Sequence, residues 1–299
     1  MAEKSSVEKQ ASGTAMATAF MRALAAYDPR KEIRGNDYLA EIFLEEEQKK
    51  PLKDPAIRAW VMKNKIAFGA YEFMIARTEF FDRIVEQALK ENIDQVVLLG
   101  AGYDSRPYRF GEFIQDTKIF ELDTKPTQQR KKEYLQEAEI SISEQISFVP
   151  INFETASLRD TLREAGFSQE KRTLFICEGV TYYLSPEVVD NMLAFVRSNS
   201  PSGSSITFDY ASLSDGALNE DGVKELRKHM QSQHSDEPTK FGIRTGKIEA
   251  FLAERGFEVI EHLTAADMNE KYLSIGGYPD VGKVPALFCL VHVTVIGKK

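Results

Sequence analysis

The stretch Val96–Ser105 constrains the fold more than any other part of the 299-residue chain. Four consecutive aliphatic residues, Val96–Leu99, run directly into Gly100-Ala101-Gly102. An unbroken apolar run of this length is typical of a strand that is buried on both faces of a parallel sheet. Glycines at the end of such a strand suit a turn whose backbone passes close to a ligand. Within the turn, Asp104 is expected to accept hydrogen bonds from neighbouring amides.

A carboxylate follows the next predicted strand. The apolar run 118–122 ends in Asp123, 21 residues after Gly102. At this spacing from a glycine turn, a carboxylate can reach the two hydroxyls of a ribose. Asp also commonly caps a following helix, and that interpretation stays open. Together the turn and Asp123 predict an adenosine-containing cofactor.

Composition excludes several classes of protein. The chain has 38 basic and 46 acidic residues, and a net charge of -8 argues against a nucleic-acid partner. It has no run of about 18 apolar residues and no apolar core of a signal peptide near Met1, so we expect a cytoplasmic protein without a membrane span. Cys177 and Cys289 lie in apolar runs and are expected to be buried thiols. With four scattered histidines, they form no metal-ligand spacing, so no metal is expected.

The first 92 residues are expected to form a helical N-terminal cap within the same globule as the remainder. Helical patterns cover 11–27, 37–48 and 57–90, with a break at Gly69. Residues 93–299 are expected to form the cofactor-binding domain. Residues 211–245 are polar and predict an insertion near its ligand edge.

From residue 93 short apolar runs alternate with helical patterns, which is typical of a mostly parallel sheet with helices on both faces. Strands are predicted over 95–99, 118–122, 146–149, 173–177, 204–210, 257–263 and 286–296. Helices are predicted over 125–139, 157–165, 186–197, 222–233 and 246–255. The last run has no helix between it and the chain end, so we expect it to pair antiparallel with a neighbour.

The turn narrows the choice of cofactor. Nicotinamide dinucleotides are bound by a motif with a third glycine, where this chain has Ser105. Pro107 suits the first turn of a helix. The turn therefore fits a methionine-type cofactor without phosphates better than a dinucleotide. A nicotinamide-dependent oxidoreductase and a binding protein without activity remain the alternatives.

S-adenosyl-L-methionine makes demands that the strand ends can meet. Asn152 and Phe153 follow the third strand and offer an amide and an apolar wall to adenine. Glu178 follows the fourth strand and offers an acceptor to the ammonium group. Ligands of open α/β sheets bind where these residues are expected, beyond the carboxyl ends of the strands. Each residue alone is also an ordinary turn residue, so the combination carries the prediction.

Four segments resemble the leucine carboxyl methyltransferase family, which includes protein phosphatase methyltransferases and bacterial and fungal O-methyltransferases of small molecules. They are Ala76–Asp82, Gly100–Arg109, Phe120–Asp123 and Cys177–Leu184. The resemblance spans about residues 12–265. It implies a class I S-adenosylmethionine-dependent O-methyltransferase: an α/β, Rossmann-like, seven-stranded and mostly parallel sheet with helices on both faces and a helical N-terminal cap.

The resemblance also implies roles for eight residues, by position. They are Arg77 for the cofactor carboxylate, Gly100, Ala101 and Gly102 beneath the methionine part, Asp123 for the ribose, Asn152 and Phe153 for the adenine, and Glu178 for the amino group and sulfonium. The phosphatase-specific enzymes commonly carry an acid at the position of Asn152, so this chain departs from them there.

Methyl transfer from a sulfonium chiefly needs an aligned oxygen nucleophile and the exclusion of water. An ionised carboxylate needs no base, whereas a phenol benefits from one. The motifs offer no obvious His or Lys base, which favours a carboxylate or acidic hydroxyl of a small molecule. The carboxyl terminus of a protein is the alternative. Tyr182 and Tyr183 are candidates for the acceptor pocket, and residues 12–15 with Arg22 are expected to form a lid. We expect a monomer or homodimer.

Overall fold

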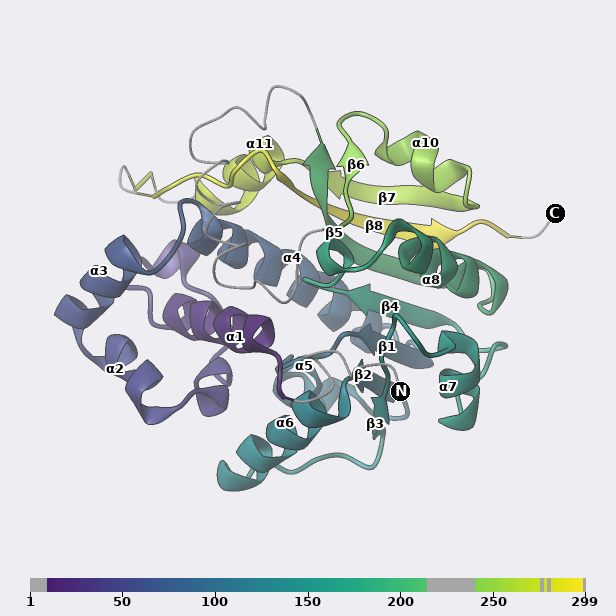
Figure 1. Ribbon diagram of the computed structural model, residues 1–299, viewed down its shortest axis with the longest axis horizontal. Helices are drawn as coiled ribbons and strands as arrows, with labels where there is room; N and C mark the ends of the chain where they lie inside the picture. The colour runs from purple at the N-terminus through teal and green to yellow at the C-terminus, as the bar shows by residue number, and fades with distance from the viewer. Residues whose placement is uncertain (1–9, 214–239, 275–276, 279–280, 298–299) are drawn as a thin grey trace, which may run out of the picture.

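The computed structural model describes residues 10–213, 240–274, 277–278 and 281–297 (Figure 1). Its centre is an eight-stranded mixed sheet in the order β3-β2-β1-β4-β5-β8-β7, with the short strand β6 paired to β5. The strands are β1 (Gln95–Leu99), β2 (Lys118–Asp123), β3 (Ile146–Pro150), β4 (Thr173–Cys177), β5 (Ser205–Leu213), β6 (Ile243–Arg244), β7 (Phe257–Leu263) and β8 (Phe288–Val295). The mostly parallel α/β fold and its seven main strands were predicted correctly, and β6 was not.

The middle of the sheet follows from its apolar runs. Every residue of β1 and of β4 is buried, as expected for parallel strands covered on both faces. β1 pairs in parallel with β2 on one side and with β4 on the other. These pairings align the carboxyl ends of the strands at one edge of the sheet.

β8 confirms the prediction for the last run. It pairs antiparallel with both β5 and β7, so the strand lies between them. The pairing with β7 is irregular between Val259 and Glu261. Cys289 on β8 and Cys177 on β4 are buried free thiols, as predicted.

Helices cover both faces of the sheet (Figure 1). Alternate residues of β1 enter two hydrophobic clusters: Val96 and Leu98 face one cluster, Val97 and Leu99 the other. The first cluster contains residues of α1 (Gly13–Ala26), α4 (Ala70–Lys90), α6 (Lys125–Glu137) and α11 (Ala265–Met268). The second contains residues of α7 (Leu158–Glu164), α8 (Pro186–Ser198) and α10 (Ile248–Ala253). Because α1, α4 and β1 share a cluster, the N-terminal helices and the sheet bury common surface; the division at residue 92 stays a prediction.

The N-terminal helices differ in part from the expected pattern. α3 (Pro55–Asn64) and α4 are separated at Gly69, which has a φ of +70°, as predicted. The single helical pattern over 37–48 was wrong. The segment instead forms the 3-10 helix η3 (Ala40–Phe43) and then the first residues of α2 (Glu46–Lys53). A new helix starts there because Gln48 Oε1 accepts a hydrogen bond from Glu45 N at 3.0 Å.

The remaining elements are short. They are η2 (Lys31–Ile33), α5 (Arg106–Arg109), η4 (Gly111–Phe113), η5 (Thr181–Tyr183) and the π-helical turn η7 (Asn269–Leu273). The helix predicted over 222–233 lies outside the described residues, and so does most of the predicted insertion, whose ends belong to β5 and β6. Within the described part of the chain, no helix is both long and apolar enough to span a bilayer.

Candidate active site

The glycine turn after β1 is fastened to the end of β2. The N–H groups of Gly100 and Ala101 both donate to Leu122 O, at 2.9 and 2.8 Å. Gly102 N donates to Asp123 Oδ2 at 2.7 Å. The structure thus brings the predicted turn and the predicted carboxylate into direct contact at the carboxyl edge of the sheet.

Both glycines of the turn are required by their surroundings within the protein. Gly100 and Gly102 have φ angles of +80° and +44°, which residues with a side chain rarely adopt. A Cβ on Gly100 would lie 2.3 Å from Val180 Cγ2, and a Cβ on Gly102 would lie 3.1 Å from Ala15 Cβ. The close approach that the sequence attributed to a ligand is therefore also made by the segment after β4 and by α1.

Asp123 presents a fixed carboxylate. Its Oδ1 accepts from Thr124 N at 2.7 Å, while Oδ2 accepts from Gly102 N. Burial raises the pKa of Asp123, and these two amides act against that rise. Thr124, and not Asp123, is the N-cap residue of α6. Each carboxylate oxygen retains acceptor capacity, so the side chain can accept two vicinal hydroxyls.

The first cap helix is tied down over this turn. Ser12 N donates to Thr127 Oγ1 at 3.1 Å, and Thr127 Oγ1 lies 3.0 Å from Thr124 Oγ1. Nearer the other end of α1, Arg22 Nη2 donates to Tyr103 O at 2.6 Å. α1 is thus linked both to the segment after β2 and to the glycine turn.

Arg77 and Glu178 were predicted to meet opposite ends of a zwitterion, and in the structure they meet each other. Arg77 is 5% exposed on α4, and its Nε lies 3.0 Å from Glu178 Oε1. Its Nη1 lies 3.0 Å from Asp209 Oδ2. Burial opposes ionisation of Glu178, but the charges of Arg106 and Arg77 outweigh it and hold the pKa of this carboxyl below its ordinary value.

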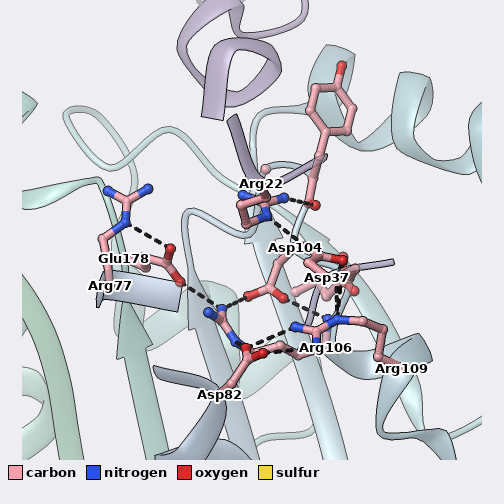
Figure 2. A network of polar contacts seen from close by, with 12 residues as sticks. Arg22, Asp37, Arg77, Asp82, Asp104, Arg106, Arg109 and Glu178 are labelled. Atoms are coloured by element: carbon pink, nitrogen blue, oxygen red, sulfur yellow. Dashed lines mark hydrogen bonds and ion pairs between the residues drawn. The ribbon is translucent and has the colours of Figure 1, made fainter. Parts of the chain in front are cut away.

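Arg106 is the centre of the cluster (Figure 2). Its Nε lies 2.7 Å from Asp82 Oδ1, and its Nη1 lies 2.7 Å from both Asp104 Oδ2 and Glu178 Oε2. Burial opposes its charge, yet these carboxylates raise the pKa of Arg106 well above its ordinary value. Asp104 Oδ1 also accepts from Arg106 N at 2.8 Å, which confirms the prediction that Asp104 bonds an amide of its own turn.

The ion pairs continue into the cap. Arg109 lies 2.9 Å from Asp82 and 3.2 Å from Asp37, and Asp37 lies 2.8 Å from Arg22. One continuous network results, in which guanidinium and carboxylate groups alternate. It contains the four guanidiniums of Arg22, Arg77, Arg106 and Arg109 and the five carboxylates of Asp37, Asp82, Asp104, Glu178 and Asp209. With every group ionised, the network holds one more negative than positive charge, which favours a cationic ligand beside it.

Three buried polar atoms in this region lack a hydrogen-bond partner. They are Arg77 Nε, Glu178 Oε1 and Tyr182 OH. The first two form an ion pair without the alignment of a hydrogen bond. Because buried polar atoms are nearly always paired, and leaving one unpaired costs about 1–3 kcal/mol, the hydroxyl of Tyr182 indicates a place for a polar ligand group.

The residues predicted for adenine lie beside Asp123. Ile151 N, immediately before them, donates to Asp123 O at 2.9 Å. Asn152 Oδ1 accepts from Glu154 N at 3.1 Å, which is the turn bond that remained open as an alternative. Phe153 is half-buried and lines a cavity of about 380 Å³ between α7 and α8. Both adenine roles stay predictions.

The two predicted pocket tyrosines belong to an aromatic cluster. The ring centres of Tyr182 and Tyr183 are 6.2 Å apart, and the ring of Tyr182 is 6.1 Å from that of Phe288. Phe288 stacks on Phe73, whose ring lies 5.4 Å from the Arg77 guanidinium. Burial, with Asp209 nearby, raises the pKa of Tyr182 well above its ordinary value, so its hydroxyl keeps its proton.

The sequence interpretation missed several members of the network. Asp82 and Asp209 were not assigned a role, and Arg106 was expected either to serve a ligand at the start of its helix or to pair with Asp104, which it does. Asp209 could have been found, because it is the one charged residue of the strand predicted over 204–210. Asp82 carried no such local signal, because a charged residue among apolar ones is ordinary on an amphipathic helix.

Glu79 predicts a pH dependence of stability. It lies on α4 and accepts from Asn36 Nδ2 at 3.0 Å. Burial, with the charge of Asp82, raises its pKa from 4.5 to about 7. The pKa of Glu79 is thus higher in the folded than in the unfolded state. The contribution of protonated Glu79 to stability is therefore full below pH 4.5 and is lost as the pH rises from 4.5 through 7. After allowance for its partial exposure, we expect about 2 kcal/mol to be lost.

Urea unfolding of the native protein and of Glu79→Gln at pH 5 and pH 8 measures this effect. The glutamine cannot ionise, so the difference in stability between the two proteins should change between pH 5 and pH 8 by about three quarters of that amount, in the direction that favours the variant at pH 8. An equal difference at both pH values would contradict the assignment.

The order of the strands defines the class of fold. A sheet of this order, with β8 antiparallel between β5 and β7 and a glycine turn followed by a carboxylate, is the Rossmann-like fold of class I S-adenosylmethionine-dependent methyltransferases. Two solved structures share the fold. They are a "putative methyltransferase" from Thermobifida fusca (16% identical, TM-score 0.57, 94% of each chain) and a duf574 family protein from Streptomyces avermitilis (14% identical, TM-score 0.58, 96% of this chain and 98% of that one).

The chain belongs to the leucine carboxyl methyltransferase family, whose model matches residues 15–197. That match ends before the limit of about 265 expected from the motifs. Among curated relatives, a Bacillus subtilis protein named "Putative S-adenosyl-L-methionine-dependent methyltransferase YktD" is 33% identical over 202 residues. The alignment covers 67% of this chain and 66% of that protein, so the chain spans just under two thirds of the relative's length.

Proposed function

We propose that the chain is an S-adenosyl-L-methionine-dependent O-methyltransferase that moves a methyl group to a carboxylate or acidic hydroxyl of a small molecule. The observation that carries the proposal is the contact between the glycine turn and Asp123, beside a buried network of alternating charged groups. A diol acceptor and a set of charged groups at one edge fit a ligand that is part nucleoside and part amino acid. The family and the names of the relatives support the same class.

The charge of the site supports this cofactor. S-adenosyl-L-methionine carries an ammonium, a sulfonium and a carboxylate, and so has one net positive charge. The network holds one surplus negative charge, and low local polarity strengthens such an attraction. A nicotinamide dinucleotide brings a negatively charged pyrophosphate, which the surplus charge disfavours.

We assign the following roles to the chain's own residues. Asp123 accepts the ribose hydroxyls, and Gly100–Gly102 form the floor beneath the methionine part. Arg77 donates to the cofactor carboxylate, and Glu178 accepts from the ammonium. Asn152 and Phe153 border the adenine. When bound, the cofactor supplies an electrophilic methyl group, and these residues fix its position.

The protein then has to align an acceptor oxygen and exclude water. α1, tied to the turn through Ser12 and Arg22, covers the site from the cap side. Tyr182 is a hydrogen-bond donor there and not a base, because its pKa is raised. An acceptor that is already ionised suits such a site, which supports a carboxylate or an acidic hydroxyl.

The proposal is tested first by calorimetry with S-adenosylhomocysteine and with NAD. We expect binding of the first and none of the second. Failure to bind S-adenosylhomocysteine, with binding of NAD, would replace the proposal by an oxidoreductase.

The acceptor class is tested by incubating the protein with methyl-labelled cofactor and a cell extract that contains both small molecules and proteins. Mild alkali releases methanol from methyl esters and leaves aryl methyl ethers intact. Alkali-labile products of low mass are expected for a carboxylate acceptor. Label found only on protein carboxyl termini would contradict the assignment to a small molecule.

A further inference from the structure

Asp209 is a fully buried carboxylate on β5 with a role in neither the sequence interpretation nor the proposed chemistry. Its two oxygens serve two different segments. Oδ1 accepts from Gly179 N, after β4, at 2.7 Å, and Oδ2 accepts from Arg77 Nη1, on α4, at 3.0 Å. Its backbone oxygen accepts from Thr181 Oγ1 at 2.5 Å. Asp209 therefore joins α4 to the segment that carries Glu178.

The guanidinium of Arg77 is held from several sides. Glu178 faces its Nε, and Asp209 faces its Nη1. The remaining nitrogen, Nη2, has Met74 Sδ at 3.4 Å, and a thioether is a weak acceptor. Thus the two carboxylates fix the orientation of the guanidinium, while Nη2 keeps donor capacity for an anionic group.

Gly179 shapes the same arrangement. It has a φ of +71°, and a Cβ at this position would lie 3.1 Å from Arg77 Nη1. The guanidinium therefore lies directly against the backbone of Gly179. A side chain there would displace Arg77 without removing any charged group.

We propose that Asp209 is a positioning residue, which acts through Arg77 and Gly179 to form the subsite for the amino-acid end of the cofactor. The inference rests on the proposed function, because it takes Arg77 as the partner of the cofactor carboxylate. It goes further because the contact between Arg77 and the cofactor carboxylate then depends on Asp209, a residue of β5. Asp209 itself need not touch the ligand.

The isosteric change Asp209→Asn separates this role from simple packing. Both oxygens of Asp209 accept from donors, so the amide of asparagine must direct its NH2 group at either Gly179 N or Arg77 Nη1. The Asp209→Asn variant therefore loses one of the two hydrogen bonds that Asp209 accepts. It also lacks the negative charge that orients the guanidinium of Arg77. Such a charge-assisted contact is worth more than a neutral one.

The test is calorimetry of the native protein and Asp209→Asn with two probes. S-adenosylhomocysteine has the amino-acid end, and 5′-methylthioadenosine lacks it but keeps the nucleoside and sulfur. We expect the dissociation constant of S-adenosylhomocysteine to rise by about tenfold or more. That of 5′-methylthioadenosine should change by less than about twofold, since it makes no contact with Arg77.

Gly179→Ala provides a second, independent displacement of Arg77 and should give the same selective loss, which decides the matter if Asp209→Asn does not fold. Asp190→Asn is the matched control. Its ion pair with Arg255 is exposed on α8, so both dissociation constants should stay unchanged.

Two results would overturn the inference. Equal weakening of both probes would mean that Asp209 only supports the fold of the site. No change for either probe would mean that Arg77 does not depend on Asp209. Failure of the native protein to bind S-adenosylhomocysteine is a different result, which removes the proposed function and this inference with it.

Discussion

Replacing Lys131 with methionine is expected to lower the free energy of unfolding by about 3–5 kcal/mol. Lys131 on α6 and Glu121 on β2 are both fully buried, and Nζ lies 2.6 Å from Oε2. Burial raises the pKa of Glu121, and Lys131 acts against that rise. Without the ammonium, the carboxylate must stay ionised in an apolar site or take up a proton. Urea unfolding at pH 7 measures the loss.

Two controls make this result specific. Lys90→Met removes an exposed pair with Glu86 and should change stability by less than about 0.5 kcal/mol. Adding Glu121→Gln to Lys131→Met should recover more than half of the loss, because the amide carries no charge and still accepts from Tyr108 OH. If Lys131→Met alone is as stable as Lys90→Met, the expected cost of the unpaired Glu121 carboxylate is refuted.

The other large effect concerns the ligand. Asp123→Ala is expected to weaken binding of S-adenosylhomocysteine by at least about tenfold, because hydrogen bonds to a charged group are worth roughly 1.5–3 kcal/mol. The same loss is expected for 5′-methylthioadenosine, since both ligands contain the ribose. Calorimetry with both ligands measures it.

The comparison with Asp209→Asn gives the prediction for Asp123 its control. Loss of a contact to the ribose weakens the binding of both ligands. Loss of a contact to the amino-acid end weakens the binding of S-adenosylhomocysteine alone. Circular dichroism must show an intact fold, because Asp123→Ala also removes the acceptor of Gly102 N and Thr124 N. Unchanged binding by a folded variant would disprove the ribose assignment.

The sheet was predictable because each main strand is marked by a short apolar run in the local sequence. β1 and β4 are apolar runs buried on both faces, and their bounds matched the sequence prediction. The long antiparallel strand β8 was recognised because no helix follows its apolar run. β6 was not predicted, since two residues paired to the end of β5 carry no periodicity.

The cap was less predictable, because contacts distant in sequence decide its shape. The periodic pattern over 37–48 favoured one helix. In the structure Asp37 accepts from Ser105 Oγ at 2.6 Å and pairs with Arg22, which holds this segment against the glycine turn. A local pattern does not contain such contacts.

For the site, the sequence identified strand-end residues and missed what links them. Asp123 and the glycine turn are in contact, and the ribose role inferred from their spacing stays a prediction. Arg77 and Glu178 were expected to face a ligand separately, yet they are joined to each other and, through Arg106, to Asp82 and Asp104. Each charged group of a buried network is stabilised by its neighbours in the network. The network therefore cannot be deduced from single residues at predicted positions.

The position of β8 bears on how the polypeptide is made. β8 follows every other strand in the sequence, yet it fills the space between β5 and β7. During synthesis, β5 therefore emerges from the ribosome long before its antiparallel neighbour exists, and its free edge is open to wrong partners. We expect the growing chain to need protection by chaperones until β8 has emerged, and the pairing of β5 with β8 to be among the slow steps of folding.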